Sequence, residues 1–188
     1  PGWGVIDAIG EPKPVWYALK RAFRPVQVVL TDEGTNGLDV HVLNETGNAV
    51  DLILELACLR DGSQPVVSAR RELTAPPRSA LKLAATDLFG AFSDTTVAFR
   101  FGPPSHDVTV ARLVAADTGT LIAEAHHFPL RRDKAMHDAA ITAIVEEEEG
   151  QWFLQLSTAA LAQSVHIEAE GFRPDDDWFH LAPGPERR

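Results

Sequence analysis

The chain has 188 residues, of which 45% are hydrophobic, enough to bury the core of one or two domains. Its formal net charge of -10 argues against nucleic acid and anionic membrane surfaces as partners, because both would repel it. No apolar run approaches the roughly 20 residues that span a bilayer. The single cysteine, Cys58, excludes an internal disulfide. It continues the alternating series Leu52, Leu54 and Leu56, which predicts a small buried side chain.

The first 25 residues predict a short strand, a turn and one amphipathic helix. Pro12 and Pro14 can begin a helix but not continue one, since each lacks an N–H and clashes with the preceding turn. We therefore predict a helix from Val15 to the next proline, Pro25. Its apolar side chains recur at helical spacing and need a surface to cover them: Val15, Trp16, Leu19 and Phe23. Basic side chains gather near its C-terminal end, where they suit the helix dipole: Lys20, Arg21 and Arg24.

Beyond Pro25 the sequence alternates strand and turn at the spacing of a β-sandwich. The candidate strands are 26–30, 38–42, 50–59, 65–73, 81–85, 97–101, 108–114 and 121–128. The segment 50–59 is long and apolar, which predicts a central strand. Two strands show clear alternation, with Leu38, Val40, Val42, Val97, Phe99 and Phe101 predicted to point inward and Thr96 and Arg100 outward. The pattern predicts one antiparallel, immunoglobulin-like β-sandwich.

The last third of the chain predicts a smaller β domain. Residues 129–138 are polar and without pattern, as in a linker. A hairpin over 139–157 is predicted to turn at Glu149-Gly150, followed by strands at 163–169 and 178–181. Four strands are few for an independent sandwich. We therefore expect further strands beyond Arg188 and an exposed sheet edge.

Both ends of the chain resemble one enzyme family. Trp3–Asp7, Gly10–Pro14 and Trp16–Phe23 resemble the closing strand and helix of the barrel in the family 2 glycoside hydrolases, β-mannosidase branch. Glu170–Pro174, Asp177–Leu181 and Pro183-Gly184 resemble the C-terminal domain of that branch. Between these ends the strand pattern alone is informative.

The resemblance implies a mainly β, C-terminal region of a larger enzyme. It assigns residues 1–25 to the end of the catalytic (β/α)8 TIM barrel, 26–129 to an immunoglobulin-like sandwich and 130–188 to a second, smaller or incomplete one. It implies a parent that hydrolyses terminal β-mannosides by a retaining, two-glutamate mechanism without a cofactor. The partners are then the upstream barrel of the same polypeptide and a β-mannoside or other oligosaccharide. Trp3 would line the sugar pocket, near the C-terminal end of the last barrel strand.

The chain alone carries no recognisable catalytic residue. In the resembled family the acid/base glutamate follows an asparagine, which draws attention to Asn44-Glu45. This pair, however, precedes Thr46-Gly47-Asn48 and predicts an exposed turn of the sandwich. The family's catalytic glutamates lie on barrel strands upstream, so we expect the fragment to be inactive by itself.

No metal site is predicted either. The acidic run Glu146–Glu149 alternates between strand faces, which favours a solvated hairpin end over a cation site. Asp175–Asp177 lies in a loop, and a weak calcium site there is the lesser alternative, since the spacing of a calcium-binding loop is absent. His126 and His127 would lie on opposite faces of a strand, and one cysteine cannot anchor zinc.

Two other functions stay open at this point. Exposed Trp152 or Trp178 would suit a carbohydrate-binding module, because a flat ring matches the apolar face of a sugar. The competing interpretation is that both rings pack in the core or between domains. A protein-interaction or adhesion sandwich is also allowed, because this fold hosts many functions.

Overall fold

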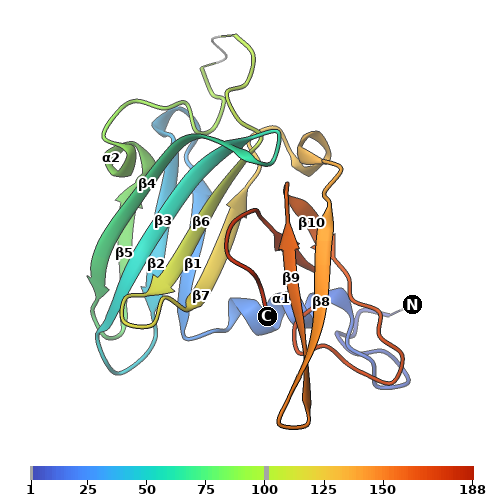
Figure 1. The fold of residues 1–188 in the computed structure, drawn as a ribbon. Helices are drawn as coiled ribbons and strands as arrows, with labels where there is room; N and C mark the ends of the chain where they lie inside the picture. Colours follow the sequence, from blue (N-terminus) through green and yellow to red (C-terminus); the bar gives the residue numbers. More distant parts are fainter. Residues whose placement is uncertain (1, 100–101) are drawn as a thin grey trace. The chain divides into compact units, whose positions relative to one another are not determined.

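The structure, a computed structural model, describes residues 2–99 and 102–188 (Figure 1). It is mainly β and built from antiparallel sheets. The chain divides into two compact units, one formed by Pro25–Ala135 and the other by the N-terminal segment to Arg24 together with Met136–Arg188. Among the described residues, no helix is both long and apolar enough to cross a membrane.

The unit Pro25–Ala135 contains two antiparallel sheets. One has the order β1-β2-β5, from β1 (Val26–Asp32), β2 (Leu38–Asn44) and β5 (Ser79–Ala84). The other has the order β4-β3-β6-β7, from β4 (Gln64–Ala75), β3 (Val50–Arg60), β6 (Val108–Ala115) and β7 (Leu121–His127). Figure 1 shows these four strands side by side, with β3 paired to both β4 and β6, which confirms the predicted central strand.

The two sheets share one hydrophobic core, which is the packing of a β-sandwich. Successive side chains of a strand point to opposite faces, so one alternating set from each sheet is buried. That set includes Leu38, Val40 and Val42 of β2, Leu52, Leu54 and Leu56 of β3, and Leu113 of β6. The predicted alternation of β2 and the predicted burial of Cys58 are both confirmed.

The predicted strand 97–101 is wrong where the structure describes it. The segment is a loop, because the Asp94 carboxylate accepts the backbone N–H groups of Ala98 and Phe99 at 2.9 and 3.1 Å. Val97 has a φ of +54°, which breaks strand geometry. The predicted faces are also reversed: Thr96 is buried and donates to the Gly34 carbonyl, whereas Phe99 is exposed. Arg100 and Phe101 lie outside the described residues.

Three short helical segments of this unit were missed. The helix α2 (Ala85–Phe89) follows β5 directly and ends at Gly90, whose φ of +70° is a left-handed C-cap. The 3-10 turns η1 (Gly34–Asn36) and η2 (Arg132–Ala135) link neighbouring elements, and η2 lies within the predicted linker.

The second unit combines one helix with two small sheets. The helix α1 (Pro14–Ala22) begins and ends close to the prediction. The strands β8 (Ile141–Glu148) and β9 (Gln151–Thr158) form the predicted hairpin, and β10 (Ala162–Val165) pairs with β11 (Phe179–Leu181). The small core comprises Leu156, Ala162, Phe179 and Leu181. The predicted strand 163–169 is too long: it ends at Val165, because the N–H of Ile167 donates to the Asp177 carboxylate instead.

Candidate functional site

The apolar face of α1 lies open to solvent in this chain. Val15, Leu19 and Phe23 are 46%, 39% and 79% exposed. The buried residue of the helix is instead Tyr17, and burial raises the pKa of its phenol above the usual value. A helix normally buries its apolar stripe. Within the described residues, α1 therefore keeps the predicted contact surface uncovered.

The opposite, basic side of α1 contacts the loop before β11. Arg21 and Arg24 both form ion pairs with the Asp176 carboxylate. Arg21 also donates to the backbone carbonyls of Asp177 and Trp178, at 2.8 and 3.1 Å. The sequence predicted the basic cluster on the helix but not its acceptor.

The segment before α1 folds as a compact turn that leaves Trp3 fully exposed. The Asp7 carboxylate accepts the N–H groups of Ile9 and Glu11, and the backbone hydrogen bond from Glu11 is the main cause that lowers the pKa of Asp7. The predicted short strand is reduced to one bridge between Ile6 and Pro12. The role of Trp3 in a sugar pocket stays a prediction.

Asn44 serves the architecture of the sandwich. It is fully buried, not exposed as predicted, and its side-chain amide contacts the carbonyls of Asn48, Ala75 and Pro76 at 2.8–3.0 Å. Its side-chain oxygen accepts from the N–H and hydroxyl of Thr46. Glu45 is exposed on the turn. Asn44 thus fastens this turn to the end of β4.

Two of the acidic candidates, Asp176 and Asp177, are held by protein partners. Asp176 pairs with arginines, and Asp177 accepts from His166 at 2.8 Å and from the N–H groups of Ile167 and Trp178. No group of three or more His, Cys, Asp or Glu side chains in residues 2–99 and 102–188 is placed to hold a metal ion.

The histidine pair on β7 is likewise paired with carboxylates. His126 lies 3.4 Å from Glu124 and His127 lies 3.1 Å from Asp32. His106 is buried nearby in the sandwich, and burial lowers the pKa of its imidazole.

A cavity of about 470 Å³ lies at the turn of the β8–β9 hairpin, lined by Glu148, Glu149, Gln151 and Phe153. Carboxylates around an aromatic ring suit a cation. Arg188 already provides one: its guanidinium lies 3.8 Å from the centre of the Phe153 ring and 2.6 Å from the Glu148 carboxylate. The chain's own Arg188 therefore takes the position that an external cation would take in this cavity.

The aromatic candidates differ in access. Trp152 is 55% exposed and meets Phe172, 61% exposed, edge to face at 6.3 Å. Trp178 is only half-buried but stacks on His166 at 4.3 Å, so its ring face is occupied. The sequence singled out Trp152. Phe172 belongs to the Glu170–Pro174 motif of the resemblance, but its loop has no strand pattern that would predict contact with Trp152.

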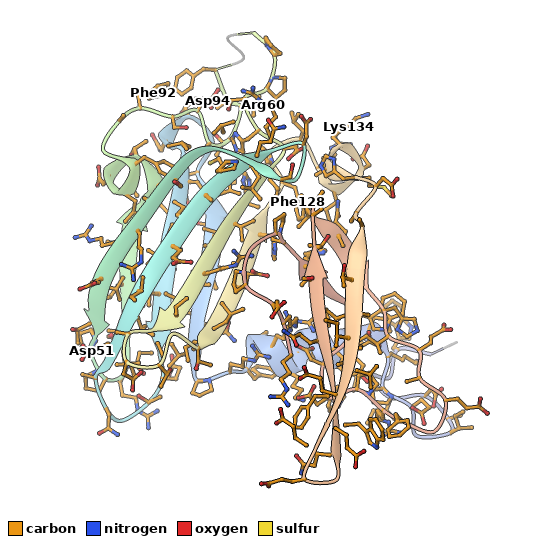
Figure 2. The ribbon with its side chains drawn as sticks, in the orientation of Figure 1. Asp51, Arg60, Phe92, Asp94, Phe128 and Lys134 are labelled. Atoms are coloured by element: carbon orange, nitrogen blue, oxygen red, sulfur yellow. The ribbon has the colours of Figure 1, made fainter. Side chains whose placement is uncertain are left out.

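A second aromatic pair was missed on the sandwich. Figure 2 shows Phe92 and Asp94 on the loop after α2. Phe92 meets Phe99 edge to face at 5.5 Å, on the loop that Asp94 holds in place. The failed strand prediction over 97–101 concealed this pair.

No protein-family model matches the chain, and no curated protein sequence matches it. Solved structures do. Over 98% of its length the chain is similar to a β-D-mannosidase from Dictyoglomus thermophilum, with a TM-score of 0.79 and 20% identity. The chain shares its fold with part of a β-mannosidase.

A second match is the exo-chitosanase CsxA of Amycolatopsis orientalis, with a TM-score of 0.66, 15% identity and 98% of this chain covered. The chain spans 22% of the mannosidase and 25% of the chitosanase. The predicted resemblance to the family 2 glycoside hydrolases is confirmed at the level of the fold.

Proposed function

We propose that this chain is the C-terminal accessory β-sandwich region of a β-mannosidase-like glycoside hydrolase. The observation that carries the proposal is the likeness over 98% of the chain to a β-D-mannosidase of which it spans only 22%. The parent enzyme would hydrolyse terminal β-mannosides, and the chain would support its catalytic domain without supplying catalytic groups.

The uncovered face of α1 supports the assignment of residues 1–25 to the end of a (β/α)8 barrel. Barrel helices pack their apolar stripe against the strands inside them. Val15, Leu19 and Phe23 form such a stripe and are left exposed by the residues that the structure describes. In the parent, barrel strands would bury it. Trp3, near the start of the segment that precedes α1, would then reach the sugar pocket.

The proposal also places the chemistry outside this chain. A retaining glycosidase needs two carboxyl groups roughly 5–5.5 Å apart, one as nucleophile and one as acid/base. Both would come from upstream barrel strands. Residues 26–129 would form the rigid sandwich that buttresses the barrel, and residues 130–188 a smaller domain.

Hydrolysis by a longer gene product tests this function. A polypeptide extended upstream through the barrel is expected to cleave an aryl β-mannoside, because it would regain both carboxylates. The purified 188-residue chain should show no turnover under the same conditions. The measurement is release of the aryl group against a panel of aryl β-glycosides.

The panel separates the parts of the proposal. Cleavage of another β-glycoside in place of the mannoside would retain the glycosidase assignment and overturn the sugar. Turnover by the 188-residue chain would contradict the accessory role. Failure of the extended protein on every substrate would refute the enzyme function.

A carbohydrate-binding function is the second candidate, favoured by one observation. Trp152 presents more than half of its surface to solvent beside the exposed Phe172 ring. Such a surface can stack on the apolar face of a pyranose. In the parent it would hold a neighbouring part of an oligosaccharide.

Tryptophan fluorescence tests this candidate. If Trp152 binds sugar, mannan oligosaccharides should quench the emission of the chain saturably, and Trp152→Ala should abolish the quenching. Trp3→Ala is the matched control: it removes another exposed indole, which would meet sugar only where the barrel completes the pocket, so the quenching of the 188-residue chain should persist. A flat titration of the wild-type chain would exclude the candidate.

A further inference from the structure

Three guanidinium groups converge on the carboxylate of Asp176. Arg21 contacts its Oδ1, and Arg24 and Arg187 contact its Oδ2, the Arg24 contact at 3.4 Å. Oδ1 also accepts the N–H of Asp177 at 2.9 Å. We call Arg21, Arg24, Asp176 and Arg187 the Asp176 cluster.

The Asp176 carboxylate is largely withdrawn from water, with 12% of its side chain exposed. A buried charge is costly unless it is paired and hydrogen-bonded. Here the partners come from two distant parts of the chain: Arg21 of α1 and Arg24 just after it, and Arg187 from the C-terminal segment. The Asp176 carboxylate therefore keeps all three arginine partners only while α1 and the C-terminal segment stay in contact.

The C-terminal side of the cluster is fixed to the small core. The Arg187 guanidinium lies 3.8 Å from the centre of the Phe179 ring on β11. Its backbone exchanges two hydrogen bonds with Leu156 on β9, at 2.7 and 2.9 Å. Both Phe179 and Leu156 belong to the core of this unit. Arg187 thus connects the Asp176 carboxylate to both small sheets.

Two further contacts hold the same helix. Lys20 donates to the backbone carbonyl of Asp175, and Arg173 pairs with Glu11, just before α1, at 2.8 Å. The loop 173–178 accordingly contacts α1 along its basic side and leaves the apolar side free. This arrangement inverts the usual one, in which a helix docks through its apolar stripe.

We infer that the loop 173–178 and Arg187 form a clasp that holds α1 through Asp176, so that the helix can offer its apolar face to another surface. The role of the clasp in the parent enzyme rests on the proposed function: there it would fasten the closing helix of the barrel to the last domain. The C-terminal domain then stabilises the catalytic domain from a distance without touching substrate.

A matched pair of variants in this chain tests the clasp. Asp176→Asn removes the central charge. Asp175→Asn removes the same charge one residue away, where the exposed carboxylate forms no ion pair with a described residue. Amide hydrogen exchange in α1 is expected to accelerate roughly 10-fold or more in Asp176→Asn, since hydrogen bonds to charged groups are strong. In Asp175→Asn it should stay within about twofold of wild type.

A second variant covers the case in which Asp176→Asn unfolds the whole unit. Arg21→Gln alters the helix alone and leaves Asp176 with two arginines. It should accelerate exchange in α1 while the amides of β8 and β9 keep wild-type protection. Equal exchange of α1 in wild type, Asp176→Asn and Arg21→Gln would overturn the clasp.

The parent provides an independent readout. In the extended protein, Asp176→Asn should shorten the half-life of hydrolase activity at raised temperature several-fold and leave the initial kcat/KM unchanged, with Asp175→Asn as control. An unchanged half-life would refute the link to the catalytic domain. An extended protein without any hydrolase activity would refute the proposed function, while exchange in the 188-residue chain would still decide the clasp.

Discussion

Replacing Leu54 with alanine is expected to destabilise the sandwich by about 2–5 kcal/mol, the range for deleting a buried leucine side chain. Leu54 is 1% exposed and lies on β3 between β4 and β6, in the shared core of both sheets. The side chains around it are held by two sheets and can refill only part of the cavity. This substitution should therefore be among the most damaging in the chain.

Labelling of Cys58 measures the effect within the sandwich itself. Cys58 is the only cysteine and is buried, and burial raises the pKa of its thiol to about 11. The reactive thiolate is thus available only when the sandwich opens. Leu54→Ala should label roughly 30-fold faster or more, since about 1.4 kcal/mol corresponds to tenfold.

Val66→Ala on β4 is the control, because it also shortens an aliphatic side chain of a strand but at a more exposed position. Its cost should stay below about 1 kcal/mol. Similar labelling rates for Val66→Ala and Leu54→Ala would show that the two sheets are not joined by the core described above.

The strands of the sandwich could be predicted because the local alternation of apolar and polar side chains shows which face of each strand is buried. Leu38, Val40 and Val42 occur at every second position, and such a period fits only one face of a strand. The segment 97–101 has the same period and yet forms a loop where it is described. The segment forms a loop because the Asp94 carboxylate accepts hydrogen bonds from its backbone N–H groups, which replace the hydrogen bonds of a sheet.

The Asp176 cluster could not be predicted for a different reason. An Asp-Asp-Asp run in a loop predicts solvation or a weak cation site. Its actual partners, Arg21 on α1 and Arg24 just after it, lie 155 and 152 positions away in the sequence, and no local pattern encodes that distance. The amphipathic period of α1 was recognised correctly, but periodicity cannot tell which side a helix docks when both its apolar and its basic sides are available.

Replacing Asn44 is the second change with a large expected effect. Asn44→Asp should cost the sandwich more than Asn44→Ala, and the alanine variant about 3 kcal/mol. The amide group faces three backbone carbonyls, those of Asn48, Ala75 and Pro76. A carboxylate has no N–H to donate and would place a buried negative charge against those oxygens. Cys58 labelling reports both variants.

Asn48→Ala is the matched control, since it deletes an exposed amide and keeps the backbone carbonyl that Asn44 uses. It should leave the labelling rate within about threefold of wild type. Wild-type stability of Asn44→Asp would show that the amide contacts are dispensable.

Substitution of the neighbouring Glu45 distinguishes a structural role of this turn from a catalytic one. Because Glu45 is exposed and lies on the sandwich, Glu45→Gln should preserve both the labelling rate and any hydrolase activity of the extended protein. A large loss of activity with unchanged labelling would instead assign Glu45 a catalytic role. Asn44 binds carbonyls of its own sandwich, so the expected pattern is a damaged fold for Asn44 and no effect for Glu45.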